Sequence, residues 1–211
     1  MKDIASLPVG DLIEELGSSS ATPGGGSASA LCASIAASLT AMVANLTVGR
    51  SRFSGVQEEM VQAAERGKAL SREFLDLAMK DCDAFDRFMK ALALPKDSEQ
   101  ERETRRISMQ EALKGSTLVP MRMVELAGDV AENCLAVASM GNRNAITDAG
   151  VSALLIKAAS RGAAMNARIN LSSIEDGSFV EENLRRLEAD LERTGTAADK
   201  VLAAVSSELP R

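Results

Sequence analysis

Asp81 occupies a position at which a helical core would normally place an apolar side chain. Residues 57–94 form one long predicted helix with a seven-residue repeat. Equivalent positions of that repeat hold Met60, Gly67, Phe74, Asp81 and Phe88. A buried carboxylate costs free energy unless it is paired or hydrogen-bonded, and its pKa is open to tuning for acid–base chemistry. The pattern suits a catalytic carboxylate and, equally, a buried ion pair or a polar residue that fixes helix register.

The amino-acid composition limits which other groups could take part in acid–base chemistry with Asp81. The sequence contains no histidine, which excludes His-based triads, histidine general bases and the usual zinc sites. Proton transfer must therefore use Asp, Glu, Lys, Cys, Ser or the substrate itself. Asp83 lies two positions further on, facing another side of the helix, where we expect a solvated charge. Cys82 is expected to be a small core residue without chemistry.

Three glycines precede a helix that contains no charged residue. The segment Thr22-Pro23-Gly24-Gly25-Gly26-Ser27 leaves backbone N–H groups open, and the helix dipole favours an anion beside them. It is not a Walker motif, because no lysine follows at the required position. A phosphate or carboxylate would suit this helix start. The alternative, slightly favoured by the motif alone, is that the glycines only let the helix begin under a crossing neighbour.

A third polar segment contains Gly141, Asn142 and Asp148. Glycine and asparagine here are typical of one helix ending and the next beginning. Asp148 falls in the first helical turn, where the dipole stabilises a carboxylate. Helix capping explains all three residues, and a catalytic or binding role is the alternative. Arg50 and Arg52 could hold substrate carboxylates or be ordinary surface cations.

Apolar periodicity predicts helices through the first half of the chain. A short helix ends at Gly17, and a second helix over 28–48 is rich in small residues. Small side chains let helices approach closely, so we expect this second helix at the centre. The helix over 57–94 closes at Pro95 and, at roughly 55 Å by 1.5 Å per residue, needs a partner along its length.

Capping signals and one proline define the predicted helix boundaries in the second half of the chain. Ser98 and Glu101 predict a capping box that opens a helix, and Pro120 is expected to kink that helix or break it into two. Two further helices are predicted over 145–171 and from Ser173 or Asp176 to Leu209. No run alternates with period two, so no sheet is predicted.

These elements predict one all-α domain over residues 1–211. The 211 residues suffice for one well-buried core, and no Pro/Gly-rich linker divides them. We expect a multihelical up-and-down bundle of about six long helices. Long rods with apolar rows tend to bury them by dimerising, so a homodimer is predicted.

Composition excludes several classes of partner. The net charge of −6 and the 2% aromatic content argue against nucleic-acid binding, which needs basic tracks and stacking platforms.

Residues 24–49 carry no charge, but their many small and hydroxyl residues favour a buried helix over a membrane span. Cys32, Cys82 and Cys134 are scattered, which favours reduced thiols in the cytoplasm. The acidic N-terminus does not resemble a signal peptide.

Six segments together resemble the cyclodeaminase/cyclohydrolase family of folate enzymes. That family includes stand-alone bacterial methenyltetrahydrofolate cyclohydrolases and the C-terminal domain of formiminotransferase-cyclodeaminase. The segments occur in the family's order, between about residues 10 and 205. They are TPGGGSASAL, MVANLTVGR, KDCDAFDRFMKALALPK, STLVPM, GNRNAITDAG and NARINLSSIEDGSF. The combination is specific, whereas the glycine motif alone would be weak.

The resemblance implies a helical homodimer with a folate pocket, no metal and no cofactor besides the folate substrate. Asp81 matches the acidic residue of the family's D-x-[DE]-A-F segment, and Asp148 matches that of its G-N-x-x-x-x-[ST]-D segment. Both become candidate catalytic residues. The family often has Glu where this chain has Asp83, which weakens any role for Asp83 and leaves that of Asp81 in place. The candidate substrate-binding residues are Gly24, Gly25, Gly26, Ser27, Asn45, Arg50, Gly141 and Asn142.

The implied substrate, 5,10-methenyltetrahydrofolate, is an amidinium cation that water attacks at the bridging carbon. A nearby carboxylate can hold the cation and take the proton, a role we predict for Asp81 with Asp148 as helper. The expected product is 10-formyltetrahydrofolate, because the sequence carries no formiminotransferase segment to deliver a formimino group. The alternatives are a formiminotetrahydrofolate cyclodeaminase that releases ammonia and a non-catalytic helical scaffold.

Overall fold

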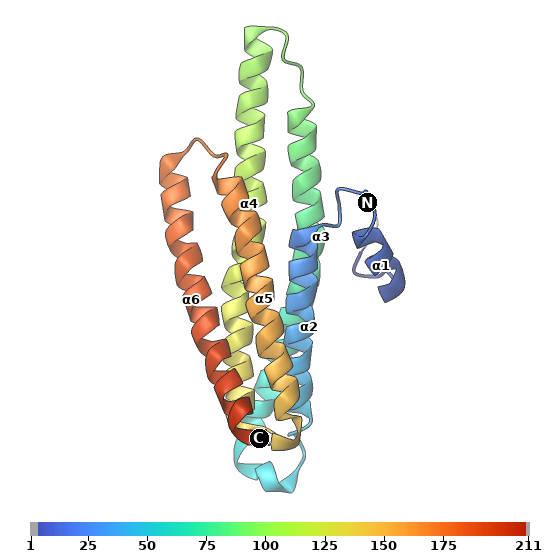
Figure 1. Ribbon diagram of the computed structural model, residues 1–211, viewed down its shortest axis with the longest axis vertical. Coiled ribbons are helices and arrows are strands. Elements are labelled where there is room, and N and C mark those ends of the chain that lie inside the picture. Colours follow the sequence, from blue (N-terminus) through green and yellow to red (C-terminus); the bar gives the residue numbers. More distant parts are fainter. Residues whose placement is uncertain (1–3, 210–211) are drawn as a thin grey trace.

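The described chain, residues 4–209 of a computed structural model, contains six α-helices and no strand. The helices are α1 Val9–Leu16, α2 Gly25–Asn45, α3 Gln57–Leu92, α4 Glu99–Met140, α5 Ile146–Leu171 and α6 Gly177–Glu208. Two short 3₁₀ helices, η1 Ser51–Val56 and η2 Arg143–Ala145, complete the connections. From α2 to α6 the helices run alternately down and up one bundle (Figure 1). The all-α prediction is confirmed, with five long helices and one short one.

The small residues of α2 let it pack closely against its neighbours. A Cβ on Gly67 of α3 would lie 2.9 Å from both the Ala37 carbonyl oxygen and the Ala41 Cβ. Only a glycine allows the two helices to approach so closely. By length and composition α2 could also cross a membrane, but 56% of the tested window is buried inside the bundle. The prediction of a buried central helix therefore holds, although α2 begins and ends three residues earlier than predicted.

Pro120 does not break α4, which continues for 42 residues from Glu99 to Met140. A proline has no N–H for the carbonyl four residues earlier, here that of Ser116. The side-chain amide of Asn170 in α5 donates to this carbonyl oxygen instead, at 3.1 Å. A tertiary hydrogen bond thus replaces the missing helical one.

Both predicted helix starts in the second half are present. Ser98 and Glu101 form the capping box, because each side chain accepts from the other residue's backbone N–H. Asp176, not Ser173, caps α6, and its carboxylate accepts from the Phe179 N–H at 3.1 Å. Lys114 of α4 adds an ion pair to Asp176 at 2.7 Å, which ties α4 to the start of α6.

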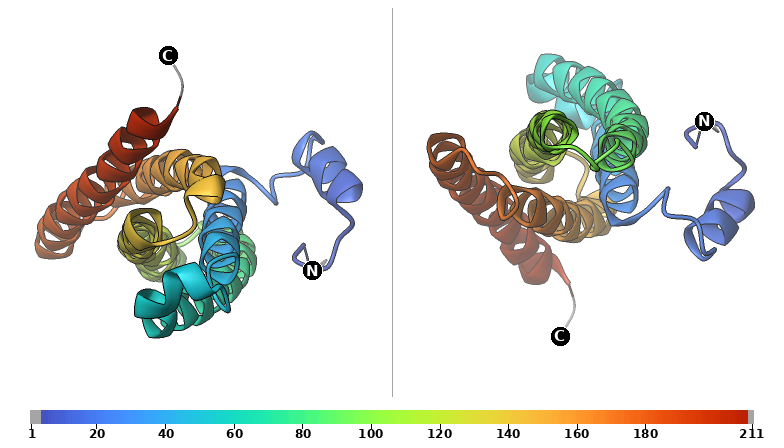
Figure 2. Two further views of the ribbon diagram at one scale, coloured as in Figure 1. Left: turned by 90° about the horizontal axis from the view of Figure 1, so that it is seen from below. Right: turned by 90° about the horizontal axis from the view of Figure 1, so that it is seen from above.

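The short helix α1 stands away from the bundle, as the end-on views in Figure 2 show. Ile4 is buried and Leu12 packs on the core, so the segment is attached. Yet Val9 and Ile13 are 76% and 62% exposed. This N-terminal arm, residues 4–17, therefore leaves large apolar side chains uncovered.

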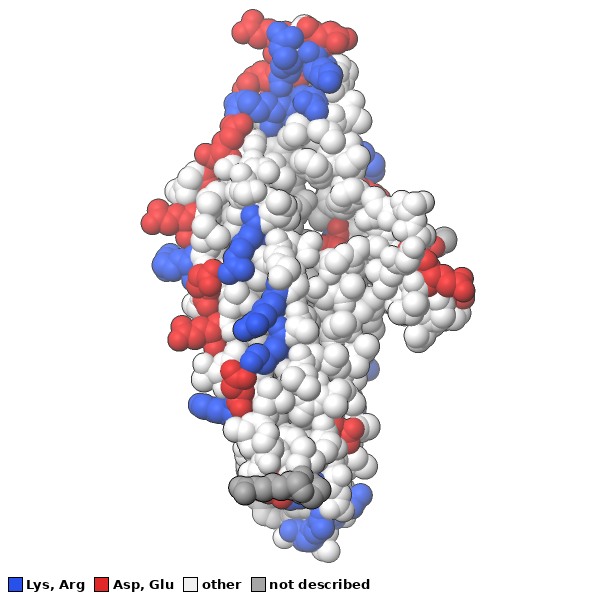
Figure 3. Space-filling model, in the orientation of Figure 1, with Lys and Arg blue, Asp and Glu red and all other residues white. Residues whose placement is uncertain are grey.

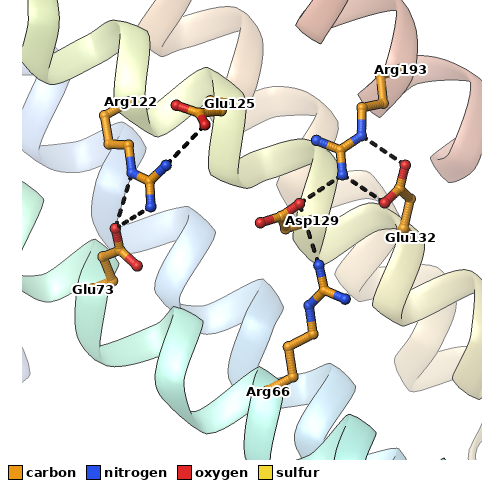
Figure 4. A network of polar contacts seen from close by, with 7 residues as sticks. All are labelled: Arg66, Glu73, Arg122, Glu125, Asp129, Glu132 and Arg193. Atoms are coloured by element: carbon orange, nitrogen blue, oxygen red, sulfur yellow. Dashed lines mark hydrogen bonds and ion pairs between the residues drawn. The ribbon is translucent and has the colours of Figure 1, made fainter.

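Arginine–carboxylate pairs join α3, α4 and α6 on one side of the bundle (Figure 4). Arg193 of α6 binds Glu132 at 2.7 and 2.6 Å and Asp129 at 2.6 Å, all between α6 and α4. Arg66 of α3 reaches the same Asp129 at 3.3 Å. A second group of pairs joins Arg122 to Glu73 and Glu125.

Candidate active site

Asp81 lies on α3 directly over the first turn of α2. The Ser27 hydroxyl donates to its Oδ2 at 3.0 Å. A Cβ on Gly26 would lie only 2.3 Å from Asp81 Oδ1, so the third glycine of the motif makes room for the carboxylate. The Asp81 carboxylate thus sits at the positive end of the α2 dipole.

Burial raises the pKa of Asp81, and the hydrogen bonds from the Ser27 hydroxyl and backbone N–H partly oppose that rise. Among residues 4–209, no lysine or arginine forms an ion pair with this carboxylate, and none contributes to its pKa. The interpretation of Asp81 as one half of a buried ion pair is therefore wrong for the described chain. A half-buried carboxylate without a cation is suited to a positively charged ligand.

Neighbours of Asp81 on α3 behave as the heptad pattern predicts. Asp83 is exposed and Cys82 is buried. Burial raises the pKa of the Cys82 thiol, which keeps it protonated and unreactive. Asp81 is thus the carboxylate of this segment that faces the interior.

A cavity of about 310 Å³ opens beside Asp81, between the N-terminus of α2 and helices α3, α4 and α5. Its volume is at the lower end of the range for small-molecule sites. Its lining residues are Ala21, Thr22, Gly24, Gly25, Gly26, Asp81, Ala84, Phe85, Phe88, Leu113, Ser116, Asn166 and Asn170. Asp81 is the only charged residue among these described lining residues, so its ionised form gives the cavity a negative charge.

Asn166 and Asn170 give the cavity polar recognition groups. Their amide nitrogens donate to the carbonyl oxygens of Gly162 and Ser116, at 2.9 and 3.1 Å. Neither side-chain oxygen accepts a hydrogen bond from another described residue. Both oxygens can therefore accept from a ligand. Sequence reasoning missed these residues, although two asparagines four positions apart in a helix share one face.

Gly24 and Gly25 line the cavity, but packing does not require a glycine at either position. A Cβ would lie 3.5 Å from the Ala21 carbonyl oxygen at Gly24 and 3.9 Å from Asn166 Nδ2 at Gly25. Ordinary side chains would fit the backbone here but would narrow the cavity. Their predicted ligand-binding role remains a prediction.

The second group of predicted residues lies at the opposite end of α2. Asn142 accepts from Arg52 at 2.6 Å, and its backbone N–H donates to the Thr47 hydroxyl at 2.9 Å. A Cβ on Gly141 would lie 2.5 Å from the Val137 carbonyl oxygen. The capping bonds that the local sequence indicates are also present: the Gly141 N–H donates to the Val137 carbonyl oxygen at 2.8 Å, and the Asn142 side chain accepts from the Asn144 N–H at 3.2 Å.

Asn45, Arg50 and Asp148 also lie outside the cavity. Asn45 lines a separate groove beside Lys68 and Arg72, and Arg50 is exposed. Asp148 is half-buried in the first turn of α5, as predicted, and makes no hydrogen bond or ion pair with the other described residues.

The height of Asp148 along the bundle follows from contacts between α2 and α5. A Cβ on Gly25 would approach Asn166, and one on Gly162 would approach Ser29. Because the two helices are antiparallel, this register puts Asp148 level with Val43, which is about 24 Å along α2 from Ser27 at 1.5 Å per residue. Contrary to the prediction that Asp148 assists Asp81, a single chain does not bring them together.

A larger groove, of about 490 Å³, lies between α5 and α6. Two of the cations that line it form ion pairs within the chain: Lys157 pairs with Asp199, and Arg168 pairs with Glu188. Within the described chain no three His, Cys, Asp or Glu side chains are placed to hold a metal ion. The Asp81 cavity therefore remains the best candidate site.

In the described chain, an all-helical bundle holds a half-buried carboxylate without a cationic partner in a cavity with both polar and apolar lining. These are the features of a small-molecule enzyme that uses an acid–base group. Comparison with known proteins then identifies the particular family. The chain belongs to the formiminotransferase-cyclodeaminase family, whose model matches residues 8–189. The resemblance inferred from the six sequence segments is thereby confirmed.

Individual relatives cover nearly the whole chain. It is 36% identical to a methenyltetrahydrofolate cyclohydrolase of Methylorubrum extorquens, over 93% of this chain and 95% of that protein. It is 31% identical to a formimidoyltransferase-cyclodeaminase of Mus musculus, over 92% of this chain but only 36% of that protein. A crystal structure of a formiminotetrahydrofolate cyclodeaminase from Thermotoga maritima matches with a TM-score of 0.88 and 28% identity, covering 97% and 98% of the two chains.

Proposed function

We propose that this protein hydrolyses 5,10-methenyltetrahydrofolate to 10-formyltetrahydrofolate in folate one-carbon metabolism. The observation that carries the proposal is the Asp81 carboxylate, which faces a cavity and has no cationic partner among residues 4–209. A relative that is 36% identical over almost the full length of both chains, named a methenyltetrahydrofolate cyclohydrolase, supports it.

In this mechanism the amidinium cation of the substrate lies against Asp81, whose negative charge offsets that of the ligand. Water attacks the bridging carbon, and Asp81 accepts the proton that the water loses. The bond from this carbon to N5 then breaks, and N5 takes up a proton while the formyl group stays on N10. A raised pKa favours the base role, because it brings the proton affinity of the carboxylate closer to that of its donor.

Other cavity residues would orient the pterin ring. The free side-chain oxygens of Asn166 and Asn170 can accept hydrogen bonds from its N–H groups. Phe85, Phe88 and Leu113 supply apolar lining. Ser27 fixes one carboxylate oxygen of Asp81, which orients the base before substrate arrives. Pre-positioning of this kind lowers the entropic barrier to reaction.

Cyclodeamination of formiminotetrahydrofolate is the second candidate function. The Thermotoga maritima structure with this name favours it, and the same cavity would serve. N10 would attack the formimino carbon, and ammonia would leave after protonation. Asp81 would then move a proton from N10 to the departing nitrogen of the tetrahedral intermediate, instead of taking a proton from water.

Two assays separate these activities. Purified protein should accelerate the loss of near-ultraviolet absorbance of methenyltetrahydrofolate. No acceleration, together with ammonia release from formiminotetrahydrofolate, would reverse the ranking.

Calorimetry with a folate tests the scaffold alternative, because a scaffold would show no binding heat. A Gly25→Asp variant should weaken folate binding, and unchanged affinity would remove the glycine segment from the site.

We further propose a cytoplasmic homodimer that uses no metal and no cofactor besides its folate substrate. The three free cysteines fit a reducing compartment. Uncovered apolar side chains on α1, α2 and α5 support association between copies. Sedimentation of the purified protein tests the dimer, and activity after dialysis against a chelator tests the metal.

A further inference from the structure

Pro120 lies inside α4 and neither ends nor divides it. The residue is buried near the middle of the 42-residue helix Glu99–Met140. A proline in a helix interior removes one backbone hydrogen bond, and its ring crowds the carbonyl four residues earlier. Both effects destabilise the helix. A residue that breaks a local rule in this way is expected to have a compensating role elsewhere in the molecule.

The compensation lies at the carbonyl of Ser116, which Pro120 leaves without its helical donor. The side-chain amide of Asn170 in α5 donates to this carbonyl oxygen at 3.1 Å. Because Ser116 is half-buried, a carbonyl without a donor would cost free energy here. The hydroxyl of Ser116 does not compete for the amide, since it donates to the Ala84 carbonyl oxygen at 3.2 Å. The proline therefore gives the Asn170 amide a defined partner.

This contact fixes which way the Asn170 amide faces. A carbonyl oxygen only accepts hydrogen bonds, so the amide nitrogen must face Ser116 and the amide oxygen must face elsewhere. No described residue donates to that oxygen. Within residues 4–209, the one side-chain polar atom that is both shielded from solvent and unpartnered is Asn183 Oδ1. The Asn170 oxygen is therefore accessible, and the hollow that Asn170 lines is the Asp81 cavity.

Asn166 presents its oxygen to the same cavity without the help of a proline. Its amide nitrogen donates within α5, to the Gly162 carbonyl oxygen at 2.9 Å. Residues four positions apart share one helix face, and about 6 Å separates them along the axis. In Figure 3 a hollow opens beside the start of α2, and most of the surface around it is uncharged. Asn166 is thus held by its own helix, whereas Asn170 depends on α4.

The cavity side chains from α3 and α5 that can bind a polar ligand are acceptors. They are the Asp81 carboxylate and the amide oxygens of Asn166 and Asn170. Such a set favours a ligand edge that carries N–H donors and disfavours one that carries acceptors. In a tetrahydrofolate this edge belongs to the pyrimidine part of the pterin, which has an amino group and ring N–H groups.

We propose that Pro120 is a positioning residue for substrate binding. By leaving the Ser116 carbonyl without a helical donor, it holds the Asn170 amide with its oxygen toward the N–H edge of the pterin. The identity of the ligand rests on the proposed function, whereas the orientation of Asn170 by Pro120 does not.

Nuclear magnetic resonance tests the orientation without any activity assay. The side-chain NH₂ signals of Asn170 can be assigned by their loss in Asn170→Leu. Pro120→Ala supplies a backbone N–H that competes for the Ser116 carbonyl. Solvent exchange of the Asn170 NH₂ should then become faster by about two- to ten-fold, as expected for the loss of one hydrogen bond. The Asn166 signals should not change.

Pro120→Ser restores the same N–H and is the second variant, and circular dichroism shows whether each variant is folded. Unchanged exchange at Asn170 in either folded variant would overturn the proposal.

Kinetics tests the consequence for the substrate. Pro120→Ala should raise KM by about two- to ten-fold with kcat nearly unchanged, because Asn170 contacts the ring and not the reacting carbon. The matched control is Pro95→Ala, which removes an exposed proline after α3 and should leave KM unchanged. A purely structural Pro120 would change the denaturant midpoint and leave KM at the wild-type value, which would overturn the proposal.

A double-mutant cycle decides whether Pro120 acts through Asn170. Asn170→Leu should raise KM at least as much as Pro120→Ala, and the double variant should be no worse, because the proline then has no amide to orient. The double variant should also be more stable than Asn170→Leu alone, since the Ser116 carbonyl regains a donor. Additive losses in KM would overturn the proposal. An inactive wild type would reject the proposed function, and the amide exchange and stability measurements would still decide the role of Pro120.

Discussion

On two faces of this bundle, carboxylates have opposite environments: one face supplies arginine partners and the other does not. Where α3, α4 and α6 meet, Asp129 and Glu132 are both bound by Arg193, and Glu73 is bound by Arg122 (Figure 4). At the start of α2, Asp81 has only the hydroxyl and N–H of Ser27. Arg193 lowers the pKa of Glu132, whereas burial raises that of Asp81.

The difference separates a structural charge from one available to a ligand. A carboxylate bound by arginine holds helices together and has little remaining capacity for a ligand. A half-buried carboxylate without a cation is disfavoured in the empty protein and becomes favourable when a cationic ligand arrives.

Asp81→Asn should keep the fold and lower turnover on the order of 10²-fold or more, because the amide neither balances the cation nor accepts the proton. Steady-state kinetics and circular dichroism measure the two outcomes. Asp83→Asn, at an exposed position on the same helix, is the control and should be fully active. Full activity of Asp81→Asn would remove this residue from the mechanism.

Gly26→Ala should lower both activity and stability, since its new Cβ would lie 2.3 Å from Asp81 Oδ1. We expect roughly 1–3 kcal/mol of destabilisation, as for other overpacked sites. Denaturant unfolding gives that value. Gly25→Ala, whose Cβ would be 3.9 Å from Asn166 Nδ2, should be much milder. Equal losses for the two alanines would contradict the steric explanation.

Arg193→Met should destabilise the fold by about 1 kcal/mol, because the paired side chains are partly exposed and screened by solvent. It should leave turnover unchanged, since this residue lies on the α4 and α6 side. Thermal unfolding and kinetics test both statements. A loss of turnover without a loss of stability would show that the two faces are coupled.

Opposite pH dependences should distinguish Asp81 from Asp176. Lys114, Ser178 and the Phe179 N–H hold the pKa of Asp176 well below its usual 3.8, so its stabilising effect is present above that pH and declines as the pH falls below it. Burial raises the pKa of Asp81 above 3.8, so its ionisation removes stability as the pH rises through the shifted value.

The measurement compares Asp176→Asn and Asp81→Asn with the wild type from pH 3 to 7. Asp176→Asn should be less stable at pH 7, and the difference should shrink toward pH 3. Asp81→Asn should be at least as stable as the wild type at pH 7, and that difference should also shrink in acid. Parallel curves for either variant would contradict the corresponding pKa shift.

The smallest effect is expected at the exposed pair between Glu65 and Lys68 of α3. Glu65→Gln should change the free energy of unfolding by less than about 0.5 kcal/mol, as is usual for surface pairs. Denaturant unfolding at low and high salt measures it. A larger effect would mean that surface pairs, and not only the network around Arg193, stabilise this bundle.

Local signals predicted the elements well and the site only in part. The Ser98–Glu101 capping box and the Asp176 cap depend on neighbouring residues, so they were readable from the sequence. The continuity of α4 through Pro120 was not, because it depends on the Asn170 amide 54 positions away from the Ser116 carbonyl. The same long-range packing hid Asn170 and Asn166 as cavity residues.

The sequence by itself determined that the chain is helical, that α2 has small side chains and that α3 has one carboxylate in an apolar row. These properties arise from periodicity and side-chain chemistry within a few turns. Only the tertiary structure decided that Gly26 makes room for Asp81, that no cation of the described chain pairs with it, and that Asp148 lies far away in the same chain. Those outcomes depend on the axial register between packed antiparallel helices. That register is set by the packing of side chains that are distant in sequence.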